Sequence, residues 1–137
     1  MNTSEENRLA EDRRIIEQAV KKKLGKPVGQ MAEVDRRRLK QLSLAGSKVV
    51  DLTALPKIAP HLTWLSLAYS DVRDITPLAA LPALAWLDLE GTYVCDLSPL
   101  DRLEKLKVLG LVDSTAADPW TPAEAAEYEK RGVKVYV

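Results

Sequence analysis

A short apolar pattern recurs along most of the chain. The segment L-x-x-L-x-L occurs four times at spacings of 23, 22 and 22 residues, beginning at Leu39, Leu62, Leu84 and Leu106. Each segment alternates in the manner of a short strand, and a turn and a second apolar stretch follow it. One such unit cannot bury its apolar face alone, so successive units must stack into a parallel sheet over one core. The pattern therefore predicts a solenoid of leucine-rich repeats, whose usual period is about 20 to 29 residues.

Aligning the four units predicts which side chains form the core. The leucines of each segment should point inward and stack from repeat to repeat: Leu39, Leu42, Leu44, Leu62, Leu65, Leu67, Leu84, Leu87, Leu89, Leu106, Leu109 and Leu111. Three further apolar columns should lie behind them: Val49, Val72 and Val94; Leu52, Ile75 and Leu97; and Leu55, Leu78 and Leu100.

Two polar columns accompany the apolar ones. The turn after each strand carries a hydroxyl, which can satisfy backbone groups at the tight corner: Ser47, Ser70, Thr92 and Ser114. Further along each unit lies an acid, at Asp51, Asp74, Asp96 and Asp118. Calcium needs about 6 to 8 oxygen ligands, which these repeats do not supply, so we interpret the acids as caps for free amide groups.

The residues before the first repeat predict a helical cap. Apolar residues recur at helical spacing over residues 8–24, and Gly25 followed by Lys26-Pro27 stops the helix. A second short helix is expected to carry Met31, Val34 and Leu39 toward the first repeat. Such a cap would seal the end of the core with a polar outer surface.

The residues after the last repeat predict a second cap. Residues 121–124 form a capping box, from which a helix should run to about Arg131 and stop at Gly132. Residues 133–137 alternate as a last strand of the sheet. The fold class is thus an α/β solenoid in a single domain 1–137, with an N-terminal cap 1–38, repeats 39–115 and a C-terminal cap 116–137.

The repeats resemble a known family. Units of 22 residues with V-x-D-[LI]-[TS]-P-L are similar to the bacterial leucine-rich repeats of the internalin type. The helix that ends in Leu24-Gly25-Lys26-Pro27 also resembles the N-terminal cap of such proteins. The resemblance implies a curved module that binds another macromolecule, usually a protein, on its concave sheet face.

Charge is balanced overall but unevenly distributed. The chain has 20 basic and 20 acidic residues, so no overall field marks it for nucleic acid or a membrane surface. Residues 1–48 hold 12 basic and 7 acidic side chains, which makes this end basic and the rest acidic. The clusters 21–23 and 36–38 allow an alternative function, anion or nucleic-acid binding. A solvated helix face is the other interpretation, because no aromatic residue lies between the basic ones for stacking.

The sequence contains no recognisable catalytic or cofactor motif. His61 has no partner motif, Cys95 falls at a variable position of its repeat, and phosphate-loop and zinc-binding patterns are missing. We therefore expect no enzymatic activity, no cofactor and no metal. Polar first residues and a single cysteine lead us to expect a cytoplasmic protein.

The candidate site is the outward side of the strands. Trp64 and Trp86 occupy the same outward position in consecutive repeats, so their indoles should stand side by side on the concave face. Other residues expected to contact a partner are Tyr69, Ser66, Asp88, Glu90, Gln41 and Val108. Exposed apolar patches usually mark interaction sites, so we expect a protein partner. An immunity-like, antitoxin-like or regulatory protein that neutralises one partner is an alternative.

Overall fold

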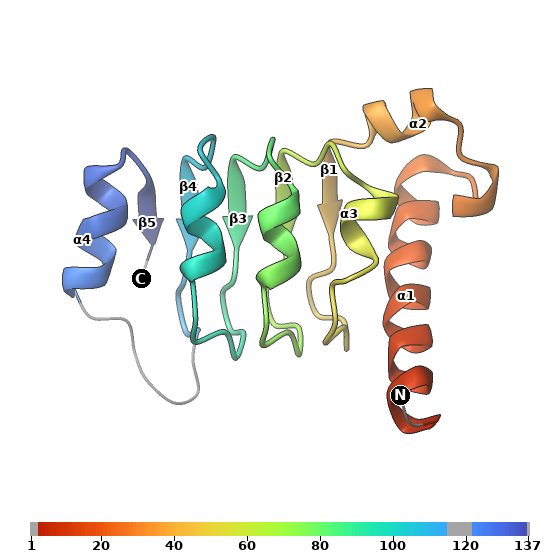
Figure 1. Cartoon of the computed structure of the whole chain (residues 1–137), viewed down its shortest axis with the longest axis horizontal. Coiled ribbons are helices and arrows are strands. Elements are labelled where there is room, and N and C mark those ends of the chain that lie inside the picture. Colours follow the sequence, from red (N-terminus) through yellow and green to blue (C-terminus); the bar gives the residue numbers. More distant parts are fainter. Residues whose placement is uncertain (1–2, 115–121, 137) are drawn as a thin grey trace.

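The chain folds into one parallel sheet, and short helices line one side of that sheet. The computed structural model describes residues 3–114 and 122–136 (Figure 1). Five parallel strands pair in chain order: β1 (Gln41–Ser43), β2 (Trp64–Ser66), β3 (Trp86–Asp88), β4 (Val108–Gly110) and β5 (Lys134–Tyr136). This is the predicted solenoid of leucine-rich repeats, including the last strand after the fourth repeat.

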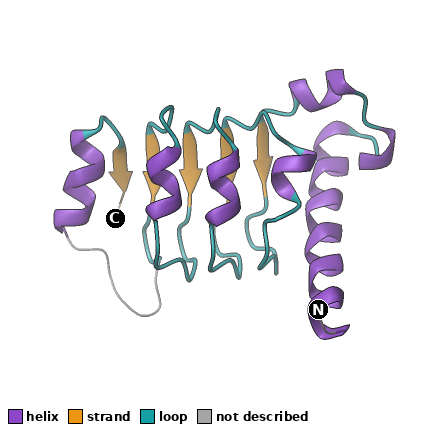
Figure 2. Cartoon of the chain, in the orientation of Figure 1, coloured by secondary structure: helices purple, strands orange, loops and turns teal. Residues whose placement is uncertain are grey.

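Short helices form the second layer, along one side of the sheet (Figure 2). They are α3 (Leu55–Ile58), η2 (Thr76–Ala80), η3 (Ser98–Arg102) and, at the end of the chain, α4 (Pro122–Lys130). The first three have a proline in their first turn, where its missing N–H leaves no helical hydrogen bond unmade. A repeat of 22 residues leaves room for only one such turn.

The core lies between these two layers. All twelve leucines of the strand segments are at most 5% exposed, and the three columns behind them are at most 2% exposed. The predicted core is therefore confirmed. Burial of a leucine side chain stabilises a fold by about 1.5 to 3 kcal/mol, which makes these columns the main stabilising feature.

Most side chains of the polar columns satisfy backbone groups within their own repeat, whereas the buried Ser114 Oγ has no hydrogen-bond partner among the described residues. The hydroxyls of Ser70 and Thr92 each donate a 2.7 Å hydrogen bond to the carbonyl oxygen three residues earlier. Asp51, Asp74 and Asp96 each accept the amide of the residue two positions ahead, at 2.7 to 2.9 Å. Hydrogen bonds from Thr76 lower the pKa of Asp74, and those from Ser98 lower the pKa of Asp96. The capping interpretation is confirmed for these three acids, while Asp118 lies outside the described residues.

The N-terminal cap is anchored by an acid that the sequence did not single out. Helix α1 (Thr3–Leu24) buries Ile16 and Val20 completely and is followed by Gly25, whose φ is +79°. Asp12 is only 4% exposed, and its two carboxylate oxygens accept the amides of Val50 at 3.0 Å and Asp51 at 3.1 Å. One side chain thus joins the cap to the first repeat.

The second short element of the cap differs from the prediction. After η1 (Val28–Gln30), α2 (Glu33–Arg38) buries none of its own residues, and Val34 is 50% exposed. The expectation that Val34 packs toward the first repeat is therefore wrong. Met31 and Leu39, which flank this short helix, are buried as expected.

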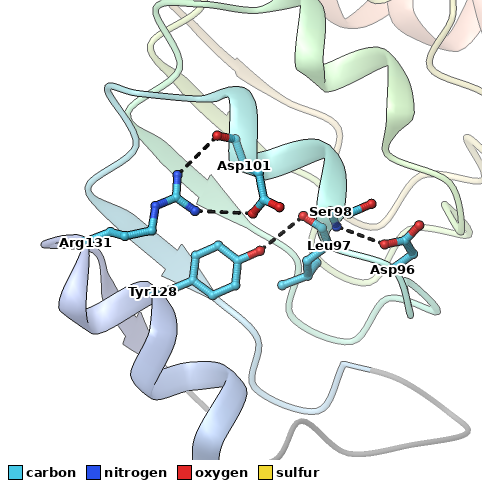
Figure 3. A network of polar contacts seen from close by, with 6 residues as sticks. All are labelled: Asp96, Leu97, Ser98, Asp101, Tyr128 and Arg131. Atoms are coloured by element: carbon cyan, nitrogen blue, oxygen red, sulfur yellow. Dashed lines mark hydrogen bonds and ion pairs between the residues drawn. The ribbon is translucent and has the colours of Figure 1, made fainter.

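The C-terminal cap packs against the third repeat (Figure 3). The Tyr128 hydroxyl donates to the carbonyl of Leu97 at 3.2 Å, and the Arg131 guanidinium contacts the Asp101 carboxylate and carbonyl at 3.3 Å each. Burial raises the pKa of Tyr128 to about 12. Gly132, with a φ of +86°, ends the cap helix as predicted. The start of the predicted capping box, at Thr121, lies outside the described residues.

Candidate protein-binding face

The open sheet face is the side of the five strands that faces away from the helices. Strand register aligns one outward residue from each strand in a single row: Gln41, Trp64, Trp86, Val108 and Lys134. A second row consists of Ser43, Ser66, Asp88, Gly110 and Tyr136. The structure thus brings Gln41 and Val108 into line with the two indoles, as expected.

The two tryptophans form a stacked pair at the centre of the first row. Their ring centroids are 4.5 Å apart and the planes are inclined by 8°. Each indole is half-buried, because one of its faces lies against the other. Neither indole N–H donates a hydrogen bond within the described residues, so both donors remain free for a ligand.

Tyr69 stands beside the open sheet face in a backbone conformation that favours glycine. Its φ is +56°, and the equivalent positions of the neighbouring repeats are Gly46, with φ +70°, and Gly91, with φ +67°. A bulky residue in the left-handed region costs about 1 to 2 kcal/mol. Aligning the repeats by their turns would have exposed this exchange of glycine for tyrosine.

The Tyr69 side chain leans across the next repeat. A Cβ atom added to Gly91 would lie 2.4 Å from Cδ1 of the Tyr69 ring, so only glycine fits beneath it. The Tyr69 hydroxyl donates to Glu90 Oε1 at 3.0 Å, and this hydrogen bond is the main cause of the raised pKa of Tyr69. The ring itself is 58% exposed and therefore accessible to a partner.

Two acids, one of them the partner of Tyr69, lie next to Trp86. Asp88 and Glu90 are both half-buried, and Asp88 Oδ1 accepts the Glu90 amide at 2.9 Å. They contribute to a shallow notch of about 250 Å³, which is lined by Trp86, Asp88, Glu90, Val108, Gly110, Val112 and Tyr136. Tyr136 was missing from the predicted contact residues.

Ser66, in contrast to the other residues expected to contact a partner, has a buried side chain. It is 5% exposed, and its Oγ accepts the Ala68 amide at 3.4 Å. The expectation that Ser66 presents its side chain to a partner is not met, and the candidate site is therefore formed by Trp64, Trp86, Tyr69, Asp88, Glu90, Gln41 and Val108.

The basic clusters lie away from this face. Lys21–Lys23 and Arg36–Arg38 occupy the last turns of α1 and α2, where positive charge is favoured by the helix dipole. Arg37 also contacts Glu33 at 3.5 Å. These positions support the solvated-face interpretation.

The described part of the chain contains few other residues that could take part in catalysis or metal binding. His61 is half-buried in the loop before β2, and Cys95 is exposed and unpaired. Residues 3–114 and 122–136 contain no group of three side chains arranged to hold a metal ion. Nor does any helix in these ranges have the length and apolar character to cross a membrane.

Comparison with solved structures agrees with the repeat architecture. Internalin C2 (inlC2) from Listeria monocytogenes superposes over 89% of this chain and 53% of its own length, with 23% identity and a TM-score of 0.69. An internalin (inlF) from the same species superposes over 73% of this chain and 30% of its own length, with 23% identity and a TM-score of 0.63. No family model and no curated protein sequence matches the chain. The chain therefore has the leucine-rich-repeat fold of these internalins and spans about half, or less, of their length.

Proposed function

We propose that this chain is a non-catalytic protein-binding module that uses the open sheet face. The stacked Trp64–Trp86 pair carries the proposal. It places two large aromatic side chains on a face that the described residues of the two caps leave open, although nothing in the repeat requires tryptophan there. Tryptophan is enriched among the few residues that dominate binding energy at interfaces.

Tyr69 supports the same proposal independently. Its left-handed backbone conformation costs stability, whereas Gly46 and Gly91 occupy the same turn position without that cost. In the fourth repeat the position is held by Asp113, whose φ is +54°. A tyrosine that costs stability and remains exposed beside an indole pair is explained by a contact with a partner. Neutralisation or regulation of one partner protein would be a particular form of this function.

The exposed, unpaired thiol of Cys95 supports a reducing compartment as the place where the module acts.

The proposal is tested by capturing the partner from an extract of the source cells. The immobilised chain and a Trp64→Ala/Trp86→Ala variant are compared by quantitative mass spectrometry. Tyr93→Ala is the matched control, because Tyr93 is an exposed aromatic residue that lies beyond the turn beside Arg73. We expect a protein that the parent and the control retain and the double variant loses. A protein retained equally by all three would place the binding site elsewhere.

A further inference from the structure

The notch beside Trp86 owes its shape to a glycine. In the second row of the open sheet face, Gly110 lies between Asp88 and Tyr136, so the row has no side chain at this point. A Cβ atom added to Gly110 would lie 2.7 Å from Asp88 Oδ1. Any larger residue would therefore fill the notch and displace the Asp88 carboxylate. Glycine here leaves open a space of about 250 Å³.

One wall of the notch is acidic and keeps unused acceptors. Asp88 uses Oδ1 to accept the Glu90 amide, and Glu90 uses Oε1 to accept the Tyr69 hydroxyl. The second oxygen of each carboxylate has no partner in the described residues, and neither acid forms an ion pair there. Two carboxylates on one wall thus favour a cation that can donate several hydrogen bonds.

Aromatic rings form the other boundaries. Trp86 gives one face to Trp64, and its other face is directed toward Val108 and the notch. Tyr136 on β5 is 47% exposed and closes the opposite side. The Lys134 ammonium of the same chain lies 5.2 Å from the centre of the Tyr136 ring, in a cation–π contact.

We propose that this notch receives an arginine side chain of the partner protein. The inference rests on the proposed function and specifies the partner's chemistry. A guanidinium is planar, stacks on aromatic rings and presents five N–H donors in a fixed fork. It can therefore lie against Trp86 and Tyr136 while it donates to the free oxygens of Asp88 and Glu90. An ammonium is compact and more strongly hydrated, so lysine fits the notch less well.

The test uses a small probe and does not require the partner. N-acetyl-L-arginine methylamide is titrated into the ¹⁵N-labelled chain, and amide and indole N–H shifts are followed by NMR. We expect saturable shifts, in the millimolar range, at Gly110, Glu90 and the Trp86 indole. The citrulline analogue, which has the same shape without the charge, should bind at least tenfold more weakly, and so should the lysine analogue.

Two variants test whether the probe binds in the notch. Gly110→Val should abolish the shifts by filling the space, and Asp88→Asn/Glu90→Gln should weaken binding at least tenfold while the side chains keep their size. Glu104→Gln, an exposed acid outside the notch, is the control and should bind the probe normally. Equal binding of arginine and citrulline, or unchanged binding by Gly110→Val, would overturn the inference.

Failure of this inference is distinguishable from failure of the proposed function. Missing arginine shifts overturn the arginine notch even if Trp64→Ala/Trp86→Ala still loses the captured protein. Capture that is insensitive to the double variant overturns the binding face, whatever the probe shows.

Discussion

The inner and outer faces of the same strands differ in how much their residues vary from repeat to repeat. At the centre of the first four strands the inward residue is always leucine: Leu42, Leu65, Leu87 and Leu109. The outward residue just before it changes each time: Gln41, Trp64, Trp86 and Val108. Close packing demands the same shape in every repeat on the inner face, whereas the outer face has no neighbour to fit. Variation on the open sheet face is therefore the place to look for function.

Adjacent substitutions on the two faces should give the largest contrast. Leu87→Ala removes a completely buried side chain and should lower the free energy of unfolding by about 2 to 5 kcal/mol. Trp86→Ala, one residue away, removes one ring of a half-buried stack and should cost only about 1 kcal/mol. Urea unfolding followed by circular dichroism measures both. Equal losses would mean that the indoles belong to the core.

The contact between the N-terminal cap and the first repeat is also buried. A substitution there should lower the free energy of unfolding almost as much as one in the core. Asp12→Ala leaves the amides of Val50 and Asp51 without their acceptor and should cost about 1.5 to 3 kcal/mol. Glu11→Ala is the neighbouring control, because its carboxylate makes only an exposed ion pair with Arg14. Urea unfolding should separate the two variants clearly. If Asp12→Ala unfolds like Glu11→Ala, the buried carboxylate does not hold the cap.

The C-terminal cap should be sensitive to alkaline conditions. The pKa of Tyr128 is raised from about 10 to about 12, because burial disfavours the phenolate. Its contribution to stability is therefore complete below the ordinary tyrosine pKa and is lost as the pH rises toward about 12. Tyr128→Phe should lose about 1 kcal/mol at neutral pH, with the hydrogen bond to Leu97, and show a shallower alkaline decline. Identical alkaline profiles for parent and variant would contradict this role.

Replacement of Tyr69 should have the opposite effect on stability from the preceding substitutions. Tyr69→Gly should raise the free energy of unfolding by about 1 kcal/mol, since glycine adopts a positive φ without steric cost. The same change should weaken partner binding, because the exposed ring is removed. Thermal unfolding and partner titration check the two effects. A loss of stability would show that the ring serves the fold and not a ligand.

The sequence predicted most features that depend on the repeat period. Equal spacing of the units placed each leucine on the inner face, and it also placed Trp64 beside Trp86, since parallel neighbours at one repeat position must pair. The open sheet face was accordingly recognisable before the structure, apart from the burial of Ser66.

Features of the two caps, which do not follow the repeat spacing, could not be predicted from the repeat pattern. Asp12 contacts amides 38 and 39 positions away, and its polar surroundings in the sequence gave no sign of burial. Tyr136 enters the notch because β5 pairs it with Gly110, and the cap strand does not follow the repeat spacing. Val34 failed as a core residue because α2 is only 6 residues long and packs through its flanks.

The affinity of Trp86→Ala for the captured partner tests the central claim most directly. Its dissociation constant is compared with those of the parent and of Tyr93→Ala, after urea unfolding has shown that all three are folded. If the open sheet face binds the partner through the indole pair, Trp86→Ala should bind about thirtyfold more weakly, the effect of about 2 kcal/mol, while Tyr93→Ala binds normally. An unchanged affinity of folded Trp86→Ala would contradict the account.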